Sequence, residues 1–293
     1  MVILPNGMSE YNAFGCDKAV DVSSFDASKP ALTVLLLNLM PEKQATERCI
    51  IDMLHSYKQP VRIIPMKISG QTYKTTPNEY MNRFYTDFEK LCHADYDGMI
   101  VTGAPLEQIS FEEVRYWEKL CHIMDWATLH TRSTLYICWA AQAALYHQYG
   151  IQKFPLEEKK FGVYPYDIKE QDKLLSCCHN PMMMPASRHT EVRLEDVAKC
   201  KALKVLAASK EAGVGIVASE EKRAVYITGH LEYPENRLDF EYHRDLAKGL
   251  RILPPENYYS KADDTNSKVA FTWRDDALGF YHGWLDCCAG IDA

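Results

Sequence analysis

One cysteine and one His-x-Glu pair are the residues of this chain best suited by type and spacing to covalent chemistry. Cys138 stands between an apolar run, residues 135–137, and an alanine-rich segment, residues 140–149. The run is typical of a buried strand and the segment of a helix, so Cys138 is predicted to lie on the tight turn of a nucleophile elbow. N–H groups at the start of a helix favour the thiolate and can hold an oxyanion. The alternative is an unreactive cysteine in the core.

A thiolate nucleophile needs a general base, and the base needs a group that orients it. His230 and Glu232 follow the apolar run 224–228, and at this spacing their side chains point the same way in extended backbone. We predict that His230 accepts and returns the proton, while Glu232 fixes its tautomer and stabilises the imidazolium. The alternative is a histidine that caps the following helix. His189 and Glu191 have the same spacing and compete for the role, although no apolar strand with a Gly turn precedes them.

The two His-x-Glu pairs could instead hold a metal ion. The chain has neither a His-Glu-x-x-His motif nor a paired-cysteine ligand set, which are the common signatures of zinc sites. We therefore expect no metal at this site.

The elements that must position these residues alternate along the chain. Apolar runs typical of buried strands are separated by segments of helical spacing, which predicts βαβ units and a parallel sheet. Functional sites in such sheets lie at the carboxyl ends of the strands. The strands are expected at residues 33–37, 61–65, 99–101 and 133–138, and the helices at residues 44–55, 80–91, 110–126 and 140–149.

The chain after residue 150 has a different pattern. Residues 155–165 are charged and aromatic and residues 180–187 are irregular, so no strand is predicted in either segment. Shorter strands are expected at residues 205–209, 214–219 and 224–228, with a helix from Pro234 to Lys248.

We predict one α/β domain at residues 32–253, preceded by an arm at residues 1–31 that lies on the domain or on a partner subunit. Residues 254–293 are expected to form a tail that packs on the domain. A length of 293 residues and a hydrophobic content of 47% allow a core of this size. The net charge of −7, without a basic block, argues against nucleic acid as the main partner.

The cysteine pattern and the absence of targeting segments indicate the compartment. The ten cysteines include no C-x-x-C pair, the start of the chain lacks a signal peptide, and no apolar run is long enough for a membrane helix. We expect a reduced, cytoplasmic protein.

Six segments are specific in combination: NLMP at 38–41, DGMIVTGAP at 97–105, YICWAAQA at 136–143, KFGVY at 160–164, SRHTEV at 187–192 and TGHLEY at 228–233. Together they resemble the homoserine O-acyltransferases of methionine biosynthesis. The resemblance extends from about residue 32 to 250 in the correct order. It implies a flavodoxin-like α/β sandwich, similar to the class I glutamine amidotransferase domain, with a mostly parallel sheet in a protein that is usually a homodimer.

The resemblance also implies a reaction. Cys138 would carry the acyl group as a thioester, with His230 as the base and Glu232 as its partner. Acetyl-CoA would be the co-substrate, no cofactor would be bound permanently, and the acyl group would pass to the hydroxyl of L-homoserine. The other implied substrate-binding residues are Lys159, Ser187 and Arg244. The Arg244 guanidinium suits an amino-acid carboxylate, whereas without the resemblance Lys159 and Arg244 would be ordinary surface residues.

Glu107, two residues after the Gly-Ala-Pro turn, bears on the choice of acyl-CoA. In this family a small residue there suits succinyl-CoA and a glutamate suits acetyl-CoA. A second carboxylate in a partly buried pocket repels that of a succinyl group, and the longer side chain also fills the space it needs. Acetyl-CoA is therefore the expected donor. The alternative is a glutamate that only precedes a helix and stabilises its positive end.

Three positions depart from the family pattern: Ala140 replaces Gly, Ala186 replaces His and Leu231 replaces Pro. They leave the acceptor open, because the methylene that separates serine from homoserine changes binding by only about 1–3 kcal/mol. The rival functions are a glutamine amidotransferase, which would use the same Cys-His-Glu set, and a non-catalytic member of the fold.

Overall fold

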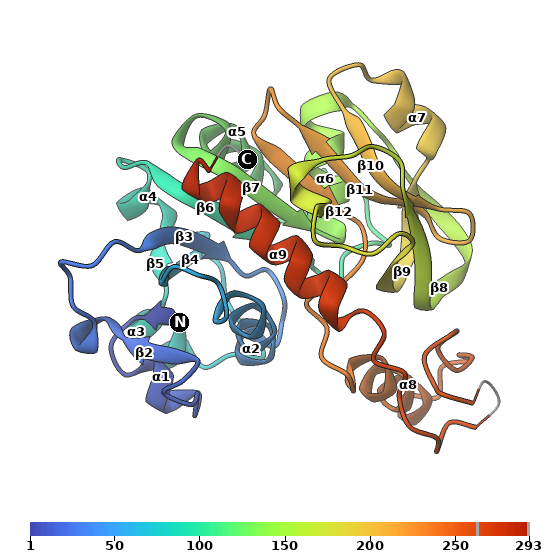
Figure 1. Ribbon diagram of the computed structural model, residues 1–293, viewed down its shortest axis with the longest axis horizontal. Coiled ribbons are helices and arrows are strands. Elements are labelled where there is room, and N and C mark those ends of the chain that lie inside the picture. The colour runs from blue at the N-terminus through green and yellow to red at the C-terminus, as the bar shows by residue number, and fades with distance from the viewer. Residues whose placement is uncertain (262–263, 292–293) are drawn as a thin grey trace.

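In the computed structural model, which describes residues 1–261 and 264–291, the apolar runs become neighbouring strands of one twelve-stranded sheet. The strand order is β2-β1-β4-β3-β6-β7-β12-β11-β10-β8-β9, with β5 beside β4 (Figure 1). The strands that run parallel to a neighbour are β1 (Val2–Leu4), β2 (Ala19–Asp21), β3 (Leu32–Leu37), β4 (Val61–Lys67), β5 (Thr86–Asp87), β6 (Tyr96–Val101), β7 (Thr131–Ile137) and β12 (Ala224–Ile227). The antiparallel side contains β8 (Lys153–Ile168), β9 (Met182–Val192), β10 (Lys204–Ser209) and β11 (Gly213–Ser219).

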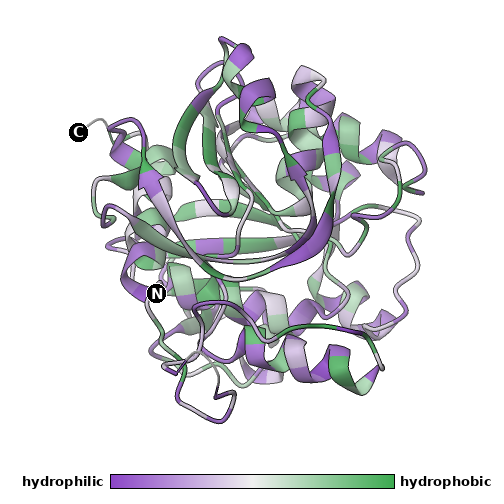
Figure 2. Cartoon of the chain, turned by 90° about the vertical axis from the view of Figure 1, so that its right-hand side faces the viewer, coloured by the Kyte–Doolittle hydropathy of each residue, from purple (hydrophilic) through white to green (hydrophobic). Residues whose placement is uncertain are grey.

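Helices cover both faces of the sheet, because the parallel strands are apolar on both sides. Along β3, Val34 and Leu36 join one core cluster, whereas Leu35 and Leu37 join the other. The first cluster is completed by α2 (Lys43–Leu54) and α9 (Arg274–Ala289), and the second by α5 (Trp117–His130) and α6 (Trp139–Tyr149). Hydrophobic residues are concentrated on the inner elements, and hydrophilic ones on the loops and outer helix faces (Figure 2). The predicted α/β sandwich with a mostly parallel sheet is confirmed.

The remaining helices are short or lie at the periphery. They are α1 (Met8–Tyr11), α3 (Asn78–Phe84), α4 (Phe88–Leu91), α7 (Leu194–Lys199) and α8 (Arg237–Ala247), with 3₁₀ turns η1 (Val22–Ser24) and η2 (Lys173–Leu175). No helix within residues 1–261 and 264–291 is long and apolar enough to cross a membrane.

Both ends of the chain contribute to this core. Residues 2–4 and 19–21 extend the sheet beyond β4, and Val2 and Ile3 are fully buried. At the other end, α9 packs on β6 and β7, where Trp284 Nε1 donates to Ser133 Oγ at 3.0 Å. The division of the chain at residues 31 and 253 stays a prediction; residues 262, 263, 292 and 293 of the tail lie outside the described residues.

Three of the expected helices are wrong in extent. The helix expected at residues 110–126 begins at Trp117, because the capping-box bond from the Ser110 N–H to Glu113 Oε2 (3.1 Å) closes only a turn. The helix expected at residues 80–91 is two short helices separated by β5. The helix expected from Pro234 starts at Arg237.

The two segments for which no strand was predicted form the long antiparallel hairpin β8–β9. Its exposed side chains include Glu157 and Glu158, and its register shifts between Pro155 and Lys160. A bulge of this kind interrupts the alternation of apolar and polar residues, so the pattern does not indicate a strand. The strands expected at residues 205–209, 214–219 and 224–228 are confirmed as β10, β11 and β12.

Candidate active site

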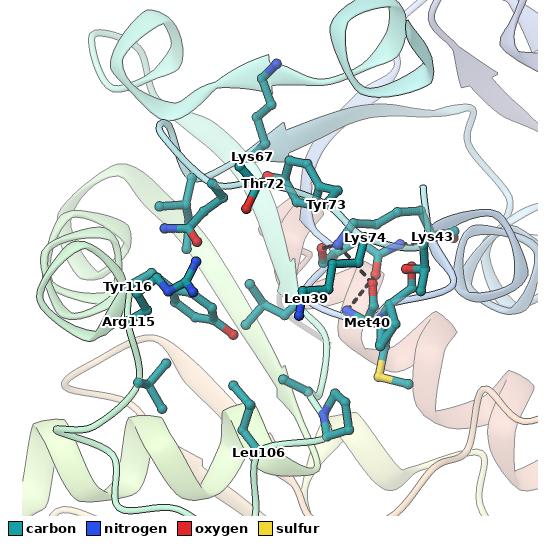
Figure 3. A pocket seen from close by; sticks show the side chains of 18 of the residues that line it. Leu39, Met40, Lys43, Lys67, Thr72, Tyr73, Lys74, Leu106, Arg115 and Tyr116 are labelled. Atoms are coloured by element: carbon teal, nitrogen blue, oxygen red, sulfur yellow. Dashed lines mark hydrogen bonds between the residues drawn. The ribbon is translucent and has the colours of Figure 1, made fainter. Parts of the chain in front are cut away.

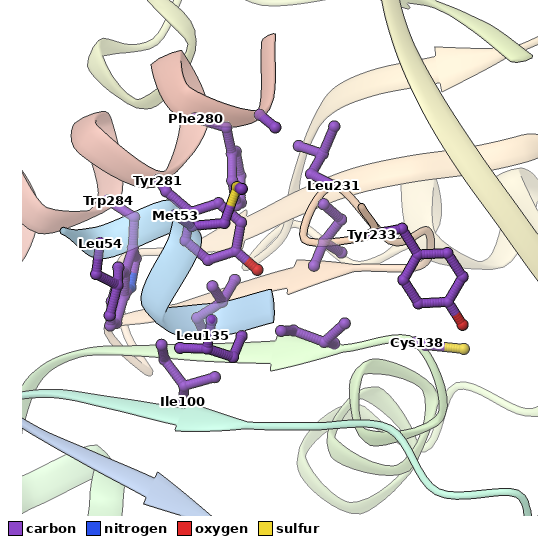
Figure 4. Close-up of a cluster of buried hydrophobic side chains, with 14 of the residues drawn as sticks. Met53, Leu54, Ile100, Leu135, Cys138, Leu231, Tyr233, Phe280, Tyr281 and Trp284 are labelled. Atoms are coloured by element: carbon purple, nitrogen blue, oxygen red, sulfur yellow. The ribbon is translucent and has the colours of Figure 1, made fainter. Parts of the chain in front are cut away.

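Cys138 lies at the end of β7, on the turn that leads directly into α6 (Figure 4). Its backbone has φ 53° and ψ −113°, a conformation that is costly for a residue with a Cβ. The turn is secured by a bond from the Cys138 N–H to the Ile227 carbonyl of β12 at 2.7 Å. The strand–turn–helix layout predicted for this cysteine is therefore present.

The loop after β6 lies against this elbow. A Cβ added at Gly103 would be 3.3 Å from Cys138 Cβ and 3.6 Å from the Trp139 nitrogen, so a larger residue would push the turn away. Trp139 is the first residue of α6, and its N–H therefore has no acceptor within the helix. An N–H group here, beside the sulfur and at the positive end of a helix, can stabilise an oxyanion.

His230 and Glu232 leave the end of β12 and form a buried pair. His230 Nδ1 is 2.7 Å from Glu232 Oε1, and the two side chains are only 6% and 7% exposed. Burial alone would lower the pKa of His230, but the negative charges of Cys138 and Glu232 and hydrogen bonds with both outweigh it and raise the pKa well above its usual value. The imidazole is thus held between the sulfur and the carboxylate, which is the arrangement needed for proton transfer.

Tyr233 connects this pair to a second polar group. Its ring stacks on the His230 ring with 4.2 Å between centroids, and its hydroxyl donates to Glu241 Oε1 at 3.0 Å. Glu241 lies on α8 and also accepts from Ser187 Oγ at 2.6 Å. Three successive contacts, through Tyr233 and Glu241, therefore connect the imidazole to the predicted substrate-binding serine.

The predicted substrate-binding residues meet around α8. Lys159 Nζ lies 3.3 Å from Asp245 Oδ2 and 3.9 Å from Glu241 Oε2, and Arg244 Nε lies 2.8 Å from Asp245 Oδ1. Lys159 belongs to the part of β8, between Pro155 and Lys160, where the register with β9 shifts. We call Lys159, Ser187, Glu241, Arg244 and Asp245 the α8 cluster.

Glu241 and Asp245 were missed by the sequence reasoning. Burial alone would raise the pKa of Glu241, but the bond from Ser187 and the charges of Arg237 and Lys159 outweigh it and lower the pKa. The available signal was the spacing of Arg237 and Glu241, which places them on one helical face and gives a 3.1 Å ion pair.

A buried lysine, Lys43, was also missed. Its Nζ donates to the carbonyl oxygens of Asn38 (2.5 Å) and Met40 (2.9 Å), which fixes the loop after β3. Burial lowers the pKa of Lys43 to about 8.

Glu107 lies in the loop after β6 and is half-buried. Desolvation raises the pKa of Glu107, and the charges of His189, His230 and Lys159 partly offset this rise. Glu107 therefore lies within electrostatic range of His189, His230 and Lys159. The competing His189 is exposed, unlike His230. Within residues 1–261 and 264–291, no three His, Cys, Asp or Glu side chains are grouped to hold a metal ion.

The elbow and the sheet order place the chain in a known structural class. It superimposes on a glutamine amidotransferase from Thermotoga maritima with a TM-score of 0.57 and 11% identity, over 89% of this chain and 99% of that one. A glutamine amidotransferase from Methylobacillus flagellatus gives a TM-score of 0.51 at 11% identity, over 88% of this chain and 94% of that one. At such identities the likeness shows the fold alone: the chain has the glutamine amidotransferase-like α/β fold.

The sequence comparison is more specific. Residues 4–291 match the model of the homoserine O-succinyltransferase family. Homoserine O-acetyltransferase of Bacteroides thetaiotaomicron is 46% identical over 87% of this chain and 84% of its own length. The homoserine O-acetyltransferase of Brevibacillus brevis is 43% identical over 91% of this chain and 87% of its own length. The chain belongs to the homoserine O-succinyltransferase family, and is an enzyme.

Proposed function

We propose that this enzyme transfers an acetyl group from acetyl-CoA to the hydroxyl of L-homoserine through a thioester on Cys138. The observation that carries the proposal is the joint geometry of the site. A cysteine with strained backbone lies near the buried His230–Glu232 pair, and Tyr233 connects this pair to the α8 cluster, which contains both cations and carboxylates. Relatives named homoserine O-acetyltransferase support the acceptor and the donor.

In the first half-reaction, the Cys138 thiolate attacks the thioester carbonyl of acetyl-CoA. The carbonyl oxygen becomes an oxyanion, which N–H groups at the start of α6 stabilise. The bond between the carbonyl carbon and the CoA sulfur then breaks, and the His230 imidazolium gives its proton to the leaving thiolate. Glu232 holds the imidazolium in place throughout.

In the second half-reaction, homoserine binds as a zwitterion at the α8 cluster. A cation, Arg244 or Lys159, receives its carboxylate and the Glu241 carboxylate receives its ammonium group. Neutral His230 takes the hydroxyl proton as the oxygen attacks the acetyl carbon. The carbon–sulfur bond breaks, which restores the Cys138 thiolate and releases O-acetyl-L-homoserine.

Glu107 supports acetyl-CoA over succinyl-CoA. A succinyl group extends two carbons further and ends in a carboxylate, whereas the half-buried Glu107 already carries a carboxyl group within electrostatic range of His230 and Lys159. The added charge would be repelled in a site with little water, and the added carbons would meet the glutamate.

The mechanism uses no resident cofactor or metal, since Cys138 carries the acyl group itself. We further propose a cytoplasmic homodimer with no nucleic-acid or membrane partner. The free cysteines suit a reducing compartment. Exposed apolar side chains on and after α8 suit a subunit contact: Phe240, Leu246, Leu250 and Leu253.

The test is product analysis with acetyl-CoA or succinyl-CoA as donor and homoserine or serine as acceptor. We expect O-acetyl-homoserine as the main product. A succinylated main product would contradict the Glu107 argument, and a serine ester would contradict the acceptor. Glutamine hydrolysis without any acyl transfer would instead support the amidotransferase alternative, which the fold likeness alone suggests.

A further inference from the structure

We propose that the cleft between the loops that follow β3, β4 and β6 binds the CoA part of the acyl donor, with Lys74 and Arg115 as phosphate ligands. This rests on the proposed function, because it identifies where the donor of that reaction lies. The cleft encloses about 530 Å³, a volume within the usual range for small-molecule sites.

The cleft lies next to the proposed reaction centre. Its wall includes Ala104, next to Gly103, which lies against Cys138. Met40 lines both this cleft and a smaller cavity lined by His230 and Glu232. In the proposed binding mode, the thioester end of the donor points past Met40 toward the sulfur while the rest of the donor remains in the cleft.

The lining matches the chemistry of CoA. Apolar side chains, among them Leu39, Ile68 and Leu106, offer a surface for the pantetheine arm. Arg115 and Tyr116 lie on one side of the cleft, and Leu39, Met40 and Lys43 on the other (Figure 3). Burial raises the pKa of Tyr116 to about 12, so its ring remains neutral and can stack on adenine.

The charge of the cleft is opposite to that of the chain. Four cations line it, Lys43, Lys67, Lys74 and Arg115, against one carboxylate, Glu113. Glu113 is bound to the Ser110 N–H at 3.1 Å. In a chain of net charge −7 this local excess of positive charge favours an anionic ligand.

Two of these cations are already engaged. Lys43 Nζ binds the loop carbonyls of Asn38 and Met40, and Lys67 Nζ is 3.3 Å from Asn82 Oδ1 and 3.9 Å from Asp87 Oδ1. Lys74 and Arg115 are exposed, and no carboxylate of residues 1–261 or 264–291 lies within ion-pair distance of either. They are the cations available to the diphosphate and the 3′-phosphate.

A second large cleft, beside Lys159, is less suited to phosphates. Its lining contains three carboxylates, Glu157, Glu158 and Glu256, beside the cations Lys159 and Arg251. The same lining includes Lys159 of the α8 cluster, which the acceptor uses. The cleft of Lys74 and Arg115 is therefore the site that electrostatics favours for the nucleotide.

The experiment compares two donors, acetyl-CoA and S-acetyl-pantetheine, which lacks the nucleotide. We expect Lys74→Ala and Arg115→Ala each to raise KM for acetyl-CoA roughly tenfold, the loss expected for one charge-assisted hydrogen bond. The KM for S-acetyl-pantetheine and for homoserine should not change. Lys201→Ala, an exposed lysine before β10, is the matched control.

Unchanged kinetics with acetyl-CoA in both variants would overturn the proposal, as would equal losses with both donors, which indicate a structural effect. If wild-type protein transfers no acyl group from either donor, the proposed function fails. Calorimetric binding of CoA then tests the cleft separately: weaker binding by the two variants than by Lys201→Ala supports the site, and equal binding overturns it.

Discussion

Replacing Glu232 by glutamine keeps the shape of the side chain and removes its charge. The Glu232 carboxylate contacts His230 Nδ1 at 2.7 Å, with both side chains almost without solvent. A hydrogen bond to a charged group contributes about 1.5–3 kcal/mol. Since about 1.36 kcal/mol corresponds to a tenfold change in rate, we expect acylation of Cys138 by acetyl-CoA to slow roughly 10- to 150-fold.

The pH dependence should change as well. The carboxylate is one of the charges that raise the pKa of His230, so Glu232→Gln lowers that pKa. Acylation needs the imidazolium as the proton donor and is lost as pH rises through the pKa of His230. The alkaline limb of the acylation rate should therefore move to lower pH in the variant.

The assay is rapid-quench mass spectrometry of the intact protein with excess acetyl-CoA, over the neutral and alkaline range. Glu235→Gln is the control, because it makes the same charge change three residues along the chain at an exposed position. Thermal unfolding of both variants checks the fold. A wild-type rate with an unshifted limb in Glu232→Gln would refute the role assigned to the carboxylate.

Three further changes test other parts of the account. Glu107→Ala should raise kcat/KM for succinyl-CoA relative to acetyl-CoA, because it removes a carboxyl group from the donor site; an unchanged ratio in competition assays would contradict this. Trp284→Ala should lower the free energy of unfolding in urea by about 3–5 kcal/mol, since the fully buried indole anchors α9; a loss below about 1 kcal/mol would mean that α9 is dispensable. Because the folded protein releases the Lys43 proton near pH 8 and the unfolded chain near 10.5, stability should rise with pH between these values, and Lys43→Met should remove that rise.

The parallel half of the fold was predictable because each strand is a continuous apolar run. The same runs placed Cys138 at a strand end, and the His-x-Glu spacing placed His230 and Glu232 at the neighbouring strand end. The structure shows the two strands paired in register, with Ile137 opposite Ile227. Local sequence therefore contained most of the information for the proposed catalytic group.

The α8 cluster depends on contacts that local sequence does not contain. Ser187 and Glu241 are 54 residues apart, and their hydrogen bond requires the β8–β9 hairpin. The charged residues of this hairpin interrupt the alternation of apolar and polar residues that would have predicted its strands. Lys43 looked like part of a polar loop, yet it is buried because its ammonium group satisfies two carbonyls of that loop. Such positions become visible only when the partner atoms are in place.

The most direct test of the central claim is a single-turnover experiment without acceptor. Wild-type protein is mixed with acetyl-CoA and digested, and the peptide containing Cys138 is examined by mass spectrometry before and after homoserine is added. We predict one acetyl group on Cys138, absent in Cys138→Ala, which homoserine removes as O-acetyl-homoserine. Product formation at the wild-type rate by Cys138→Ala, or an acetyl group that homoserine does not remove, would contradict the thioester mechanism.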